Sequence, residues 1–186
     1  MTIPLWKQRL QGARQREGRK RSARWLQLAT VAKDGSARVR TLVFRGWVGN
    51  EALDLFSDQR SDKVEELQHQ PQAEICWLFP NARHQYRLRG LIHQLSVDEA
   101  PDICRQAWIA LTASGRALWG WPSPGQPFHK DAEFPEEISA DTDPPHHFLI
   151  LRLMIERVEL LDLSCHPHQR LLWCRSTDWQ EQRLNP

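Results

Sequence analysis

Basic and hydroxyl-bearing residues gather between positions 38 and 63. Residues 38–45 form a strand-like run rich in arginine, and a second run ends in Phe56-Ser57 before Ser61 and Lys63 open a helical segment. Positive charge, hydroxyl donors and the N–H groups of a helix start are the groups that bind phosphate. The spacing is therefore compatible with a site for a phosphate-bearing ligand. The alternative, exposed arginines beside an ordinary helix cap, is the more common origin of such a pattern.

The composition argues against a membrane-spanning, secreted or disordered chain. The 186 residues are 40% hydrophobic and 26% charged, with a formal net charge of +2. The longest apolar runs, at 73–80 and 148–155, are far shorter than the roughly 20 residues of a spanning helix. The first ten residues lack the apolar run of a signal peptide, and the four cysteines show no CxxC spacing and are expected to be reduced. We therefore expect a single cytoplasmic domain, residues 1–186, without membrane association.

Most of the chain after residue 25 predicts short strands. Runs rich in β-branched and aromatic residues occur at 28–32, 37–45, 52–56, 73–79, 85–95, 148–161 and 170–175. Lys33-Asp34-Gly35-Ser36 separates the first two runs and is typical of a hairpin turn. Seven short strands within one domain indicate a barrel or a sandwich. The expected class is mainly β, with some helix.

Three segments show helical spacing. Residues 1–24 begin with a short amphipathic helix near Pro4 and continue as a basic segment. A second helix is expected at 61–68, with Ser61 as N-cap and Val64 and Leu67 inward, and a third at 98–111, with Ile103, Ala107 and Leu111 at helical spacing. Residues 121–145 are rich in proline and acidic residues without periodicity, which predicts a long loop.

Four motifs follow one another in a distinctive order. They are RxxxxR on a strand, FS(x3)SxK entering a helix, an apolar strand at 73–79, and RHQYRLRG at 83–90. In this order they resemble the pyridoxamine 5'-phosphate oxidase family of FMN-binding split barrels. The resemblance covers 26–95 well and 156–186 more loosely, including the closing Arg-Leu-Asn-Pro. It implies a six- to seven-stranded antiparallel split β-barrel with flanking helices, FMN as cofactor, and a homodimer with FMN at its interface.

The resemblance also implies roles for individual residues. Arg40 and Lys63 would bind the FMN phosphate, while Gln85 would offer a donor and an acceptor to the flavin ring. Arg170 would lie near the ring, where positive charge stabilises reduced flavin, and His168 is the catalytic candidate for substrate positioning or proton transfer. The implied cofactor-binding residues are Arg40, Thr41, Leu42, Val43, Arg45, Phe56, Ser57, Ser61, Lys63, Gln85, Gln126 and Arg170. The glutamine at 126 would come from the other subunit.

Several positions depart from the family pattern. Asp62 stands where the family has an arginine, and Leu161 stands where it has a tryptophan. His166-Pro167-His168 replaces the family's Arg-Leu-His, and alanines at 112–117 replace an arginine and a serine that hold the substrate phosphate. The residues that bind vitamin B6 phosphate are thus not retained. We expect an FMN-dependent oxidoreductase with a small-molecule substrate that the sequence does not identify.

Three other functions compete with this interpretation. A split barrel could bind flavin or haem without turnover. Six of the eleven residues from 14 to 24 are basic, as in a nucleic-acid-binding arm, but the small net charge favours a solvated helix end and no nucleic-acid partner. Cys165, His166 and His168 are residue types that bind zinc, but their spacing matches no closed structural site, so we expect no metal.

Overall fold

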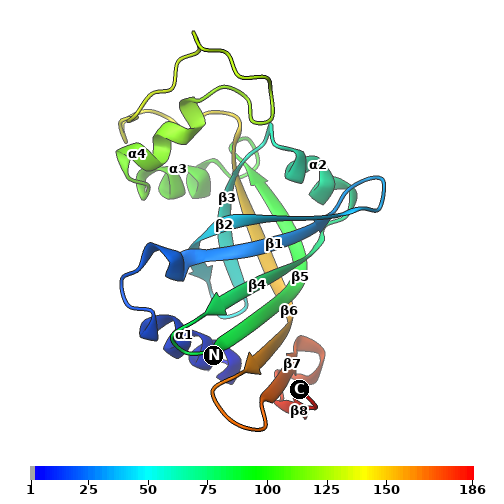
Figure 1. The fold of residues 1–186 in the computed structure, drawn as a ribbon. Helices are drawn as coiled ribbons and strands as arrows, with labels where there is room; N and C mark the ends of the chain where they lie inside the picture. Colours follow the sequence, from blue (N-terminus) through cyan, green and yellow to red (C-terminus); the bar gives the residue numbers. More distant parts are fainter. Residues whose placement is uncertain (1–2) are drawn as a thin grey trace. The chain divides into compact units, whose positions relative to one another are not determined.

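An antiparallel sheet of eight strands dominates the computed structural model, which describes residues 3–186 (Figure 1). The strand order is β3-β2-β1-β4-β5-β6-β7-β8, and a further pairing of β3 with β6 closes six strands into a barrel. The strands are β1 (Trp25–Val31), β2 (Ala37–Val48), β3 (Ala52–Asp58), β4 (Gln72–Phe79), β5 (His84–Ser96), β6 (Phe148–Asp162), β7 (Gln169–Cys174) and β8 (Gln182–Leu184). The predicted antiparallel split barrel is confirmed. The sequence does not predict β8, because three residues are too few to show alternation.

The predicted hairpin between β1 and β2 forms around Asp34 and Gly35. The strand pairing ends at Val31 opposite Ala37. Gly35 has a φ of +80°, a conformation that favours glycine, and the Asp34 carboxylate accepts a hydrogen bond from the Ser36 N–H at 2.9 Å. The turn sets the register of the pair, and the register decides which face each β2 side chain occupies.

Short helices precede and connect the strands. They are α1 (Leu5–Arg16), α2 (Asp62–His69), α3 (Pro101–Ile109) and α4 (Ala113–Ala117), with 3₁₀ turns η1 (Arg21–Arg24), η2 (Leu118–Gly120) and η3 (Arg175–Thr177). Within residues 3–186, none of the helices combines the length and the apolar character needed to cross a membrane. Residues 121–145 contain turns and bends but neither helix nor strand.

Helix α3 starts later than its sequence predicts. The periodicity predicts a start at residue 98, whereas the helix begins at Pro101. Cys104 and Trp108 are buried, and Ile103 is 41% exposed. Proline suits the first helical turn, where a missing N–H costs no helical bond, and the large Trp108 side chain decides the buried face. The other two predicted helices are confirmed as α1 and α2.

The chain packs as two compact units, each with its own core. The first contains residues up to 55, 66–93 and 152–186, and the second contains 56–65 and 94–151. The core of the first unit is aromatic, because the Phe44 ring centroid lies 5.3 Å from that of Trp47 and 5.0 Å from that of Trp77. Such ring pairs contribute about 0.5–1.5 kcal/mol beyond their buried area. The expectation of a single domain stays a prediction.

The core of the second unit is also built from large aromatic rings. The Phe148 centroid lies 5.0 Å from Trp119 and 5.5 Å from Trp108. The Trp119 indole N–H donates to the backbone oxygen of Ser57 at 3.0 Å. This bond connects the core of the unit to the last residues of β3, where a predicted site residue lies.

Replacement of Gly90 tests the close approach of β5 to β6. A Cβ atom at this position would lie 1.9 Å from the backbone oxygen of Met154. Because backbone cannot move aside easily, we expect Gly90→Ala to lower the free energy of unfolding by about 3 kcal/mol, measured by urea denaturation. Gly12→Ala in α1 is the control. A Cβ atom added at Gly12 would have no heavy atom outside its own helix backbone and chain neighbours within 4 Å, and alanine favours a helix. Equal stability of the two variants would contradict this packing.

Candidate functional site

A lysine and two serines meet where β3 ends and α2 begins. Lys63 Nζ lies 2.7 Å from Ser61 Oγ and 3.2 Å from Ser57 Oγ. The Ser61 hydroxyl donates in turn to the backbone oxygen of Asp58 at 2.6 Å. Ser57 is only 4% exposed, so its position is set by the surrounding core. The structure thus brings together three of the predicted cofactor ligands, and a cation with two hydroxyls at a helix start suits an anion.

Arg40, the second cation predicted to bind phosphate, already contacts a carboxylate. Its Nη2 lies 2.6 Å from Glu66 Oε2, and its Nη1 donates to the Thr30 hydroxyl. That hydroxyl donates to the same Glu66 oxygen at 2.5 Å. Burial raises the pKa of Glu66, but hydrogen bonds from Thr30 and Arg40 together with the Arg40 charge outweigh it, so the pKa lies below its ordinary value. The guanidinium is therefore held by residues of β1 and α2.

The remaining β2 residues of the predicted site lie on both sides of the strand. Thr41 is exposed, while Leu42 and Val43 are partly buried where they pair with β1. Arg45 is also partly buried. Burial, and secondarily the positive charge of Arg24, lower the pKa of Arg45. Because an arginine starts from so high a pKa, its guanidinium stays charged near neutral pH.

A pocket of about 230 Å³ is lined by two side chains that the sequence assigns to the flavin ring. Gln85 on β5 and Arg170 on β7 both line it, together with Leu161 near the end of β6. Leu161 pairs directly with Arg170, and directly paired residues place their side chains on the same face of a sheet. Gln85, Leu161 and Arg170, from three different strands, thus line one pocket.

Two charged residues that the sequence pattern did not predict as site residues also line this pocket, namely Arg87 and Glu159. The strand pattern could have indicated Arg87, because residues two positions apart in a strand lie on the same face and Gln85 was already assigned to the site. Glu159 has no comparable signal, since an acidic residue in a strand is usually solvated. Its role depends on partners from two other strands.

Glu159 holds three arginines beside the pocket. Arg157 donates to its Oε1 through Nε and Nη2 at 3.1 and 2.8 Å. Arg170 donates to Oε2 through Nε and Nη2 at 3.0 and 2.7 Å, and Arg87 donates to the same oxygen. Glu159 is 6% exposed. Burial raises its pKa, but the three arginines lower it to about 2, so the carboxylate stays charged and holds Arg170 in place.

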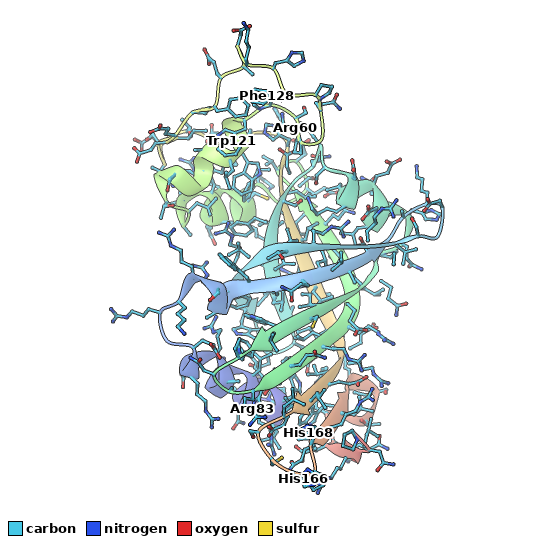
Figure 2. The ribbon with its side chains drawn as sticks, in the orientation of Figure 1. Arg60, Arg83, Trp121, Phe128, His166 and His168 are labelled. Carbon is cyan, nitrogen blue, oxygen red and sulfur yellow. The ribbon has the colours of Figure 1, made fainter. Side chains whose placement is uncertain are left out.

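Gln126 and His168, the two remaining polar predictions, lie on loops. Gln126 lines a second pocket, of about 490 Å³, formed within residues 121–134. His168 is exposed on the loop between β6 and β7, and its Nδ1 lies 2.9 Å from the backbone oxygen of Cys165 (Figure 2). His168 is not among the described residues that line the pocket of Gln85.

Phe56 packs against the core of the second unit. Within residues 3–186, no three His, Cys, Asp or Glu side chains are arranged to hold a metal ion.

Comparison with known proteins decides the family. The family model described as "Pyridoxamine 5'-phosphate oxidase, FMN-binding domain" matches residues 3–96. The chain belongs to this family. Pyridoxine/pyridoxamine 5'-phosphate oxidase 2 of Arabidopsis thaliana is 30% identical over 197 residues, which cover 99% of this chain and 98% of that protein. A pyridoxine/pyridoxamine 5'-phosphate oxidase of Pseudomonas savastanoi is 29% identical over 86% of this chain and 76% of its own length.

Two solved structures share the fold. A "pyridoxamine 5'-phosphate oxidase-related, FMN binding protein" from Nostoc punctiforme PCC 73102 superposes with a TM-score of 0.91 and is 33% identical, with 100% of both chains covered. PhzG from Burkholderia lata 383 superposes with a TM-score of 0.78 at 20% identity, covering 98% of this chain and 91% of its own. The second likeness shows the split-barrel fold alone.

Two departures from the family pattern now have a structural setting. Asp62 is exposed and is the first residue of α2. A carboxylate there stabilises the helix through its dipole, but it opposes an anion bound at the same helix end. Leu161, where the resemblance implies a tryptophan, lines the pocket of Gln85 and Arg170. Leucine keeps this wall apolar but cannot stack on a ring.

The ion pairs between Glu159 and its three arginines predict a free energy of unfolding that depends on pH. Because the folded pKa is lowered to about 2, the carboxylate stabilises the fold above the pKa of the unfolded chain and loses this effect as pH falls from about 4.3 toward 2. We expect Glu159→Gln to lower the free energy of unfolding by about 2–3 kcal/mol at pH 7, since one pKa unit corresponds to about 1.4 kcal/mol. Urea denaturation at pH 7 and pH 3 should show the difference from wild type shrinking at the lower pH. A constant difference would show that Glu159 acts through packing instead.

Proposed function

We propose that the protein binds FMN and acts as a cytoplasmic oxidoreductase on a small-molecule substrate. The observation that carries this proposal is the shared pocket of Gln85 and Arg170, in a chain that belongs to an FMN-binding family. The relative from Nostoc punctiforme is itself described as FMN binding. The four free cysteines agree with a reducing compartment.

The chain has side chains suited to both ends of FMN, the phosphate and the flavin ring. Lys63, Ser57 and Ser61 provide a cation and hydroxyls for a phosphate. Gln85 provides an amide that both donates and accepts, which suits the edge of the flavin ring. When bound, FMN would supply two-electron redox chemistry. Arg170, already oriented by Glu159, would place positive charge beside the ring and favour its reduced, anionic form.

The catalytic role of His168 rests on its chemistry. An exposed imidazole can both donate and accept a proton. His168 precedes Arg170 by two residues, so it is close in sequence to the proposed flavin contact. We propose that it positions the substrate or transfers a proton to it.

An apolar sheet face supports a homodimer. Trp25 and Val31 on β1 are 50% and 38% exposed, and Val39 on β2 is 70% exposed. The strand register places them on one face with Leu78 of β4, which is 49% exposed, and with Leu91 of β5, which is 37% exposed. Five exposed large apolar side chains on one face of a sheet favour an interface. We propose that a second copy covers this face, and that Gln126 reaches the flavin of that copy.

A flavin titration tests the cofactor. The purified protein should show visible flavin bands and bind added FMN with a higher melting temperature. Lys63→Met should weaken FMN binding about 10- to 100-fold, because a hydrogen bond to a charged group contributes about 1.5–3 kcal/mol, and should leave riboflavin binding unchanged. Lys33→Met, in the exposed β1–β2 turn, is the matched control. Absence of flavin bands and of any melting shift would refute the cofactor assignment.

Reduction of the bound flavin tests the activity. Candidate donors, NADPH among them, are mixed anaerobically with the FMN-loaded protein while flavin absorbance is followed, and oxygen is then admitted. If the protein is an oxidoreductase, the flavin absorbance should bleach when a donor is added and recover when oxygen is admitted. Flavin that no donor reduces would support a non-catalytic binding module.

Substitution on the apolar face tests the homodimer. Val39→Glu places a charge in the proposed interface and should convert a dimer to a monomer at micromolar concentration, as measured by analytical ultracentrifugation. Val39→Thr preserves shape and β-branching and should remain dimeric. Wild-type protein that is monomeric and still holds FMN would overturn the two-chain site.

A further inference from the structure

Arg40, which we propose to bind the flavin phosphate, is already paired with the carboxylate of Glu66. Glu66 Oε2 accepts one hydrogen bond from Arg40 Nη2 at 2.6 Å and another from the Thr30 hydroxyl at 2.5 Å. The side chain of Glu66 is 8% exposed and that of Arg40 is 22% exposed. The ion pair is therefore largely shielded from water, where its charges interact strongly with one another and with any anion that approaches.

Each cation predicted to bind phosphate has an acidic neighbour. Arg40 is paired with Glu66, and Lys63 follows Asp62 directly in the sequence. A phosphate group is held best by an excess of positive charge, so each of these carboxylates opposes it.

We propose that Glu66 competes with the flavin phosphate for Arg40 and so determines how strongly the site prefers FMN to riboflavin. The inference rests on the proposed FMN binding and assigns Glu66 as a specificity-determining residue. A phosphate reaching Arg40 must share the guanidinium with a carboxylate that already uses Nη2, and the two anions repel across a poorly solvated space. Riboflavin lacks the phosphate and does not meet this repulsion.

The variant Glu66→Gln tests the inference directly. Glutamine has the same shape and keeps an oxygen that accepts from Arg40 and Thr30, but it removes the charge. We expect the Kd for FMN to fall about ten-fold and the Kd for riboflavin to change less than two-fold, both measured by flavin fluorescence titration. The exposed neighbour Glu65 is the matched control, and Glu65→Gln should leave the FMN-to-riboflavin ratio within two-fold of wild type.

A double-mutant cycle separates competition from a general structural effect. In the Arg40→Met background, Glu66→Gln should give a smaller increase in FMN affinity, because the guanidinium for which the two anions compete is gone. An equal increase in both backgrounds would overturn the inference. If Glu66→Gln does not fold, Glu66→Met removes the same charge with a side chain of similar length and must give the same shift in preference.

The outcomes distinguish this inference from the proposed function. Wild-type protein that binds neither FMN nor riboflavin would overturn the proposed function together with this inference. Wild-type protein that binds FMN, with an unchanged FMN-to-riboflavin ratio in Glu66→Gln, would overturn the role of Glu66 alone.

Discussion

Closure of the barrel by the pairing of β3 with β6 is the constraint on which the rest of the structure depends. Across this pair, Arg152 donates to both carboxylate oxygens of Asp54 at 2.8 and 2.9 Å. The planar guanidinium suits two parallel bonds, which fix direction as well as distance. β6 then continues to Asp162 and pairs with β7. That continuation places the side chains of Leu161 and Arg170 at one pocket.

The charged residues of the candidate site are ordered by ion pairs with buried carboxylates. Glu66 orders Arg40, and Glu159 orders Arg170 with two further arginines. A buried carboxylate is stable only when it is paired, so each acid forces its arginines into fixed positions. Such order is favourable for binding or redox chemistry, because the charges need no rearrangement. The same carboxylates also reduce the positive field that an anion meets, and the balance between the two effects sets affinity.

The split barrel itself does not specify a reaction, because one fold supports many activities. What belongs to this chain is the set of side chains that its strands and loops present. Leu161 lines the pocket of Gln85 and Arg170, and His168 lies on an exposed loop.

The local patterns of the sequence determined most of the fold. Alternation and β-branched residues identified seven of the eight strands, and Asp34-Gly35 identified the hairpin, since these signals depend on neighbours in the chain. Helix α3 shows the limit, because its buried face depends on what Trp108 packs against. Motif order placed Ser57, Ser61 and Lys63 together correctly, since they are adjacent in sequence. Only the tertiary structure decided that Glu159 binds three arginines and that Glu66 binds Arg40. These contacts join residues from different strands and helices, and their strength comes from burial, which no local pattern records.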